Sequence, residues 1–219
     1  MTGVLDRGRL TGWAVLISVL AILGYASRAA GGKPDKDVAY QYSTAVSGIV
    51  QYGIILALVL VIARPDWRRL LALRAPSSYR RVLPVAALVL VLTIGVELVV
   101  GLVSNPGREQ GLTPEGWDSH RATQFAVNFA IFTVVAPVVE ELTFRGLGYS
   151  LLAPLGQTAA ILWIGIAFGL AHGLIEGLPI LIVFGAGLAL LRARTDSVYP
   201  GVVVHAAFNA IALIGSVTT

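Results

Sequence analysis

The stretch FAVNFAIFTVVAPVVEELTFRG, residues 125–146, joins an apolar run to two carboxylates and an arginine. Residues 125–139 carry no formal charge, and Glu140, Glu141 and Arg145 then follow with no loop in between. A charged side chain inside a bilayer costs roughly 2.5–3.5 kcal/mol on insertion scales, so such residues face the interior of a helix bundle and usually have a task. The placement of these three side chains therefore bears on both fold and function.

The composition of the whole chain matches this stretch. Of its 219 residues, 56% are hydrophobic and only 13% are charged, and the mean hydropathy is +0.80. Soluble domains carry roughly 25% charged residues. The composition therefore predicts an all-α, polytopic transmembrane helix bundle. The absence of cysteine excludes disulfides, thiolate metal ligands and a cysteine nucleophile.

Apolar segments close to the ~20 residues that a helix needs to cross a bilayer recur along the chain. The seven predicted helices are residues 11–28, 43–63, 82–103, 121–144, 156–173, 178–193 and 199–216. No internal repeat or soluble domain interrupts them. We divide the chain into N-terminal transmembrane helices with their loops, residues 1–120, and a core that carries the polar motifs, residues 121–219.

The basic residues predict the orientation of these helices, because Lys and Arg concentrate in cytoplasmic loops. A cytoplasmic N-terminus places most of them on the inner side, namely Arg7, Arg9, Arg64, Arg68, Arg69, Arg74, Arg80, Arg81, Arg145, Arg192 and Arg194. The outer side then holds Arg28, Lys33, Lys36, Arg108 and Arg121. The C-terminus is outside, in a multi-pass protein of the cell membrane. Membrane orientation thus accounts for the net charge of +4, and no nucleic-acid partner is expected.

Two segments near the inner face each allow two interpretations. The first apolar segment is expected to be an uncleaved helix rather than a signal peptide, because residues 27–29 make a poor small-residue cleavage site. Residues 67–74 mix apolar and basic residues at about helical spacing. They are expected to lie on the inner membrane surface, with a plain cytoplasmic loop as the alternative.

Helical geometry separates the roles of the two adjacent carboxylates, because neighbouring residues point about 100° apart. Glu141 and Arg145 are four residues apart and can form an ion pair on one helix face. Glu140 has Phe144 at that spacing and gains no local cation, so it can project into the bundle as a general base. The alternative is that the helix ends here and all three charges are solvated.

Two histidines lie in similar apolar surroundings further along the chain. FGLAH, residues 168–172, ends the fifth segment, and Gly165, Gly169 and Gly173 form a small-residue stripe that would let a neighbouring helix approach. HAAFN, residues 205–209, places His205 and Asn209 on one face of the last helix. Polar groups in a bundle need partners, so a structural role is the alternative for each. His120 lies beside Asp118 in an outer connection and is expected at the surface.

These inward-facing groups predict hydrolytic chemistry by one of two routes. His172 and His205 with a carboxylate could bind Zn²⁺ and leave room for a water molecule. Without a metal, Glu140 and a histidine could activate water while His205 and Asn209 donate hydrogen bonds to a developing oxyanion. Both routes hydrolyse an amide, and the sequence leaves both open.

The three motifs together resemble a known family. EExxxR at residues 140–145, FxxxH at residues 168–172 and HxxxN at residues 205–209 occur in this order on consecutive helices. The chain resembles the CPBP intramembrane proteases over about residues 121–215. That family includes the type II CAAX prenyl endopeptidases and the bacteriocin-processing or immunity proteins of the Abi group.

The resemblance implies hydrolysis of a peptide bond inside the membrane, in a lipidated protein, a leader peptide or another membrane protein. It implies a CPBP-like protease core at residues 121–219, as a metalloprotease or a metal-free glutamate protease. The implied catalytic residues are Glu140, His172, His205 and Asn209, with Glu141 and Arg145 in support and His172 and His205 as ligands of any Zn²⁺.

Two other functions stay open, and one geometric conflict arises. The chain could be a non-catalytic immunity or interaction protein, or a proton-coupled transporter that uses Glu97. At 1.5 Å per residue, the predicted helices place Glu140 and His205 ~6–9 Å from the inner side and His172 ~24 Å from it. The three could not meet if every helix crossed straight. Either the fifth segment is tilted, displaced or re-entrant, or the predicted boundaries are wrong.

Overall fold

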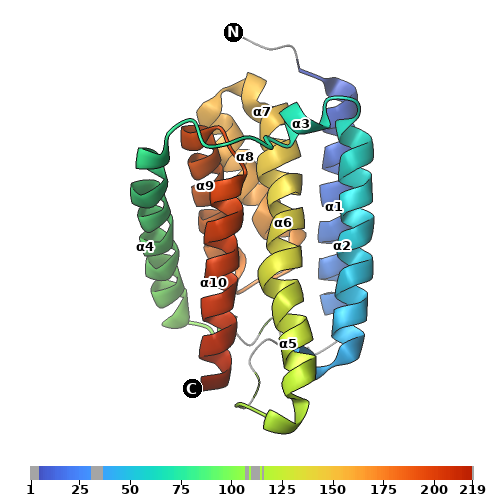
Figure 1. Cartoon of the computed structure of the whole chain (residues 1–219), viewed down its shortest axis with the longest axis vertical. Coiled ribbons are helices and arrows are strands. Elements are labelled where there is room, and N and C mark those ends of the chain that lie inside the picture. The colour runs from blue at the N-terminus through green and yellow to red at the C-terminus, as the bar shows by residue number, and fades with distance from the viewer. Residues whose placement is uncertain (1–4, 31–36, 107–108, 110–113, 115, 219) are drawn as a thin grey trace.

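The computed structural model describes residues 5–30, 37–106, 109, 114 and 116–218, and these residues form helices and connections with no strand. The prediction of an all-α, polytopic bundle is confirmed (Figure 1). Within the described ranges, six helices are long and apolar enough to cross a membrane, and Gln157–Ala171 is a shorter apolar helix. The chain is therefore a multi-pass membrane protein.

The observed helices follow the seven predicted segments. Six of the segments are uninterrupted α-helices: α1 (Arg7–Ala29), α2 (Tyr42–Ala63), α4 (Val82–Gly101), α8 (Gln157–Ala171), α9 (Leu178–Thr195) and α10 (Tyr199–Thr218). The fourth span, Ser119–Leu155, is a continuous run that comprises α5 (Ala122–Ala130), η5 (Ile131–Val135), α6 (Ala136–Glu141), η6 (Leu142–Gly148) and α7 (Tyr149–Leu152) between two short 3₁₀ turns. A helix pairs its backbone N–H and C=O groups internally, which is necessary in a bilayer because no water is present to hydrogen-bond with them.

The prediction that the fourth helix ends at residue 144 is wrong, and this error accounts for the predicted difference in depth between Glu140 and His172. The helix continues past Arg145 to Leu155, because Arg145 is buried in the bundle and does not need a loop. Glu140 thus lies about 15 residues, or roughly 20 Å, from the end of its helix, and His172 lies equally far from the start of α8. Both residues reach the same depth without a re-entrant segment.

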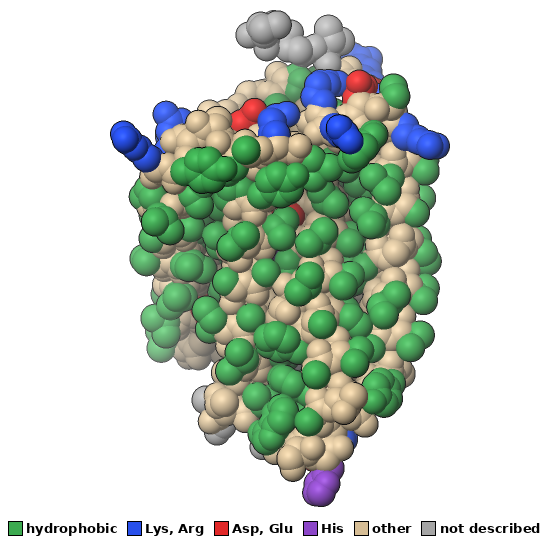
Figure 2. All heavy atoms as spheres, viewed as in Figure 1, with side chains coloured by type: hydrophobic (Ala, Val, Ile, Leu, Met, Phe, Trp, Pro, Cys, Tyr) green, Lys and Arg blue, Asp and Glu red, His purple; other side chains and the backbone are tan. Residues whose placement is uncertain are grey.

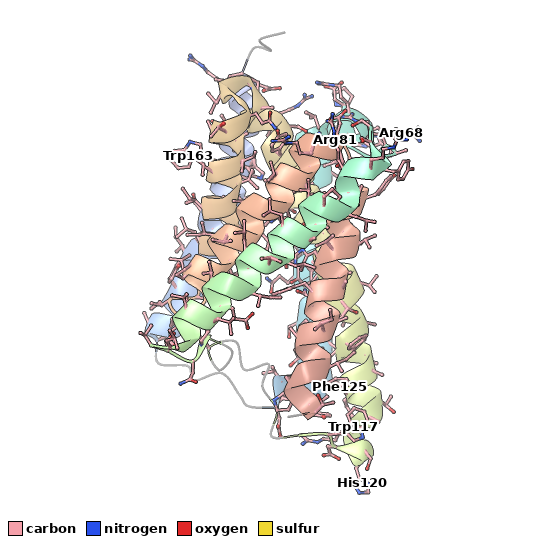
Figure 3. The ribbon with its side chains drawn as sticks, turned by 90° about the vertical axis from the view of Figure 1, so that its left-hand side faces the viewer. Arg68, Arg81, Trp117, His120, Phe125 and Trp163 are labelled. Carbon is pink, nitrogen blue, oxygen red and sulfur yellow. The ribbon has the colours of Figure 1, made fainter. Side chains whose placement is uncertain are left out.

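The basic side chains gather at one end of the bundle (Figure 2). Arg68 and Arg81 lie at that end, whereas Trp117 and His120 lie at the opposite tip of the fourth span (Figure 3). Two members of the predicted inner group, Arg145 and Arg192, have buried side chains. Lys33, Lys36 and Arg108, which were assigned to the outer side, fall outside the described residues.

The connection after α2 packs into the bundle instead of lying on the membrane surface. It contains the short helix α3 (Trp67–Leu70), and its apolar residues Leu70, Leu71 and Ala72 are buried. Gly146 allows this insertion, because a Cβ there would lie 2.9 Å from the Cα of Leu71. The arginine-rich end is thus anchored directly to the helix that carries Glu140.

Glycines bring α8 close to its neighbours. A Cβ at Gly165 would lie 2.8 Å from the carbonyl oxygen of Ile182 in α9, and Gly169 is equally tight against the Ile182 side chain. Gly173 adopts a φ of +63° and faces Gly24 of α1. The predicted small-residue stripe therefore packs against two helices, and it fixes the end of α8 where His172 lies.

Candidate active site

Glu140 lies near the end of α6, with its two carboxylate oxygens in different surroundings. Oε1 accepts a hydrogen bond of 2.9 Å from the hydroxyl of Tyr52 in α2. Oε2 is buried and has no hydrogen-bond partner among the described residues. A buried carboxylate oxygen without a partner is costly and calls for a water molecule, an ion or a substrate group.

The two histidines of the core helices converge on this same oxygen. The Nε2 atoms of His172 and His205 lie 3.8 Å and 3.7 Å from Glu140 Oε2. Hydrogen bonds to water oxygen are about 2.8 Å long, so one water molecule can bridge Oε2 and either nitrogen. The structure therefore brings a carboxylate and two imidazoles, which the sequence placed on three separate helices, around one small space.

The other ring nitrogens fix how each imidazole faces this space. Nδ1 of His172 donates to the carbonyl oxygen of Phe168 at 2.7 Å, and Nδ1 of His205 donates to Glu141 Oε1 at 3.1 Å. Both partners are acceptors, so each Nδ1 carries the hydrogen. In the neutral rings, Nε2 is then an acceptor aimed toward Glu140, which is the tautomer that a base or a ligand requires.

Glu141 and Arg145 form the predicted ion pair, with both side chains 0% exposed and 2.7 Å between Oε1 and Nη1. Arg145 also donates to the carbonyl of Gly185 in α9 at 3.0 Å and lies 4.3 Å from the ring centre of Phe168. A Cβ at Gly201 would clash with Glu141 Oε2, so α10 approaches only because residue 201 is glycine. The pair thus joins the fourth span to its neighbours and supports His205.

Asn209 lies on α10 one turn beyond His205, and its described bond is to the backbone. Its Nδ2 donates to the carbonyl oxygen of Phe132 at 2.9 Å. Phe132 belongs to the π-helical η5, where the partner of a carbonyl is the N–H five residues later. For Phe132 that residue is Pro137, which has no N–H. Asn209 therefore satisfies a carbonyl that Pro137 leaves free.

Two cavities of about 840 Å³ each meet at the carboxylate. Gln51, Tyr52, Glu140 and His172 line both of them. The first is otherwise almost wholly apolar and lies between α1 and α2. The second contains His205 and Asn209, as well as Glu97 of α4. Asn209 thus shares a cavity with the other predicted site residues without being hydrogen-bonded to them.

The sequence analysis missed Tyr52 and Gln51 as part of this site. Their signal was present, since they are a polar pair in the middle of the apolar helix α2. Nothing in the sequence linked α2 to Glu140, 88 residues away. His120 lies exposed at the far tip of the fourth span, so its expected surface position is confirmed (Figure 3).

The atoms around this space include possible ligands of a metal ion. Glu140 Oε2 and the two Nε2 atoms are of the types that Zn²⁺ binds. Within the described part of the chain, however, no group of three His, Cys, Asp or Glu side chains is arranged to hold a metal ion. The donor set does not fit a metal as it stands, and the chemistry proposed here uses the side chains alone.

One family model matches part of the chain. Residues 122–211 match the family model described as type II CAAX prenyl endopeptidase Rce1-like. The matched segment runs from the start of α5 into α10, so it includes Glu140, His172, His205 and Asn209. Tyr52 lies outside it, in the N-terminal half of the chain. No curated protein and no solved structure matches the chain.

Proposed function

Because residues 122–211 carry an Rce1-like domain of the kind found in CPBP proteases, we propose that this chain is an intramembrane endopeptidase. It hydrolyses a peptide bond of a membrane-associated protein, with lipidated proteins and leader peptides as the candidate substrates. The observation that carries the proposal is the buried Oε2 atom of Glu140. It has no hydrogen-bond partner in the described part of the chain and lies 3.7–3.8 Å from two imidazole nitrogens.

The proposed reaction begins with a water molecule held between Glu140 Oε2 and the Nε2 of His172. Glu140 accepts one proton, while the water oxygen attacks the scissile carbonyl carbon and an oxyanion forms. Collapse of this intermediate breaks the C–N bond, and Glu140 returns the proton to the departing amine nitrogen. A general base of this kind contributes about 10²–10⁴ in rate.

His205 and Asn209 are proposed to stabilise the oxyanion. Glu141 accepts from Nδ1 of His205 and so fixes the orientation of the ring. When the ring carries a proton on both nitrogens, its Nε2–H can donate to the oxyanion. Asn209 Nδ2 has two hydrogens, of which the Phe132 carbonyl uses one. The second can donate into the shared cavity. Donors placed before the reaction act most strongly in a site that excludes bulk water.

The two cavities suit a substrate with one apolar and one more polar part. The cavity between α1 and α2 is lined almost entirely by aliphatic side chains, so an apolar segment or a lipid chain fits there. The adjoining cavity carries hydrogen-bonding groups for a peptide backbone. The arginine-rich end faces the cytoplasm of a cell membrane, which places the start of α1 inside and the end of α10 outside.

The test is cleavage by the purified full chain in detergent. Its substrates are a peptide with a prenylated cysteine near its C-terminus, the unmodified twin of that peptide, and an apolar leader-type peptide. Wild-type protein should cleave at least one of them, and the Glu140→Gln variant should cleave none. Cleavage of none by the wild type, or equal cleavage by the variant, contradicts the proposal. Zinc content and a chelator arm decide whether a metal takes part.

A further inference from the structure

A third, smaller cavity lies at the arginine-rich end, away from Glu140. It has a volume of about 250 Å³, and its charged lining residues are Arg69, Arg74, Arg192 and Asp196. Tyr149 and Ser150 of α7 complete its polar wall. Tyr149 is nine residues beyond Glu140 on the fourth span, or roughly 13 Å along the helix. The cavity is thus separate from the proposed catalytic centre.

Three distant chain segments are tied together to build this cavity. Ser150 Oγ in α7 donates to the carbonyl of Leu70 in α3 at 2.8 Å. Arg74 donates from Nε to the backbone carbonyl of Asp196, just beyond α9, at 2.8 Å. Hydrogen bonds thus hold the backbone of all three segments in place around the cavity.

The charges that line the cavity do not cancel. Asp196 Oδ1 accepts from Arg74 at 2.7 Å and from Arg192 at 2.8 Å, so one carboxylate is shared by two guanidinium groups. Arg69 adds a third, and its nearest carboxylate is 3.7 Å away at Asp66. The lining therefore carries three positive groups and one negative group, which favours an anion.

The surroundings of the Arg192 guanidinium group indicate that a ligand binds in this cavity. Its side chain is only 6% exposed, and it lies over the ring of Tyr149 at 5.2 Å from the ring centre. Its Nε is buried and has no hydrogen-bond partner among the described residues. A guanidinium group presents its N–H donors in a planar fork that matches the oxygens of a phosphate.

We propose that this cavity binds the phosphate group of an anionic phospholipid. The arginines gather at this end of an otherwise apolar bundle (Figure 2), where a phosphate layer would lie. Basic pockets between membrane helices on the cytoplasmic side recognise lipid headgroups in this way. The volume of 250 Å³ equals that of about eight water molecules, which is enough for a glycerophosphate group. A free phosphate ion has the same chemistry, so the test separates the two sources.

The test measures binding of phosphatidylglycerol, phosphatidylcholine and inorganic phosphate to the full chain in detergent. Native mass spectrometry counts the retained lipids, and the shift of the melting temperature gives the affinity. Phosphatidylglycerol should stabilise the wild type and be retained at one copy, with phosphatidylcholine clearly weaker. Stabilisation by inorganic phosphate at the same arginines would identify the free ion as the ligand. No stabilisation by either phosphate source overturns the proposal.

The variants separate this site from general surface charge. Arg69→Gln removes an exposed lining residue and should weaken phosphatidylglycerol binding about fivefold. Arg192→Gln should weaken it further, and the Arg69 variant still decides the matter if Arg192→Gln fails to fold. Arg194→Gln is the matched control, because Arg194 is exposed on the same last turn of α9 and does not line the cavity. An equal loss in the Arg194 variant contradicts a specific site. The readout needs no peptide cleavage, so it stands apart from the proposed protease function.

Discussion

The fourth span and α4 each carry a carboxylate within an apolar helix, but the surroundings of the two carboxylates differ. Glu140 lies near the middle of the fourth span, and Glu97 lies four residues before the end of α4 at Gly101. Glu140 receives a hydrogen bond from α2 and faces imidazoles from α8 and α10. Glu97 of α4 is exposed, lines the second cavity, and has no hydrogen bond or ion pair with the described residues. Side chains from three other helices thus surround the Glu140 carboxylate, whereas the Glu97 carboxylate is not held in this way.

Packing explains this difference. In its most apolar window, 39% of the fourth span is buried, against 17% for α4. Figure 3 shows α4 lying along α9 and diverging from α10 toward the end where His120 lies. Glu97 therefore borders an opening, whereas Glu140 sits at a junction of helices. Substitutions at Glu140, at Glu97 and at the partners of Glu140 can therefore test this difference in surroundings.

The largest expected effect comes from Glu140→Gln, compared with Glu97→Gln. Loss of the proposed base should lower kcat by about 10³-fold, because the amide cannot accept a proton while the shape is kept. Glu97→Gln should leave turnover close to the wild-type value, since Glu97 makes no described contact with the site residues. Turnover of a cleaved peptide and the melting temperature of each variant are the measurements. A reversed order of the two losses would place the base on α4.

Arg145→Ala should reduce stability by about 3–5 kcal/mol, because it leaves Glu141 buried without its cation. Arg68→Ala, at an exposed position of α3, serves as the control and should have little effect. Combining Arg145→Met with Glu141→Leu should recover much of the loss, since both charges then disappear. Thermal unfolding in detergent measures all of these, and an unchanged melt for Arg145→Ala would contradict the pairing.

Asn209→Ala should lower kcat by about 10²-fold with little change in KM, as expected for a donor to the oxyanion. Pro137→Ala in the same protein separates the two roles of this side chain, because it restores an N–H for the Phe132 carbonyl. If Asn209 only satisfies that carbonyl, the double variant regains activity. Persistent loss of kcat in the double variant supports the oxyanion role, and a change confined to KM argues against it.

Tyr52→Phe should lower kcat about tenfold, because the hydrogen bond that orients Glu140 is lost. The phenyl ring keeps the packing of α2, so the melting temperature should stay near the wild-type value. A loss of stability without a loss of turnover would make Tyr52 a structural residue alone. This variant also tests whether the N-terminal helices, which the family match does not cover, contribute to the site.

The smallest effect is expected far from the site, at Asp118. A hydrogen bond from Arg121, together with a bond from the His120 backbone, lowers the pKa of this carboxyl against its desolvation. Its contribution to stability is therefore present above the ordinary pKa of about 3.9 and is lost as pH falls through the lower folded value. Between pH 5 and pH 2, the melting temperature of the wild type should fall ~1–2 °C further than that of Asp118→Asn. If the melting temperatures of the wild type and of Asp118→Asn fall equally over this pH range, the prediction is wrong.

The sequence predicted those features that depend on composition and short spacing. The seven apolar segments and the ion pair between Glu141 and Arg145 follow from such local patterns, and both are confirmed. The predicted end of the fourth helix was wrong because Arg145 is paired with Glu141 inside the bundle, and the helix continues past it. Tyr52 and the insertion of Leu71 against Gly146 escaped prediction because they depend on contacts between remote segments. The catalytic roles of the site residues stay predictions.

The length of the fourth span has a consequence for the membrane around it. A helical run of 37 residues is roughly 55 Å long, whereas the hydrocarbon layer is ~30 Å thick. The excess must be taken up by tilt or by projection of the tip with Trp117 and His120 into the headgroups (Figure 3). A thinner or thicker bilayer would change that tilt and shift the depth of Glu140 along with it. The lipid composition of the host membrane would thereby set the depth of the cavity around Glu140.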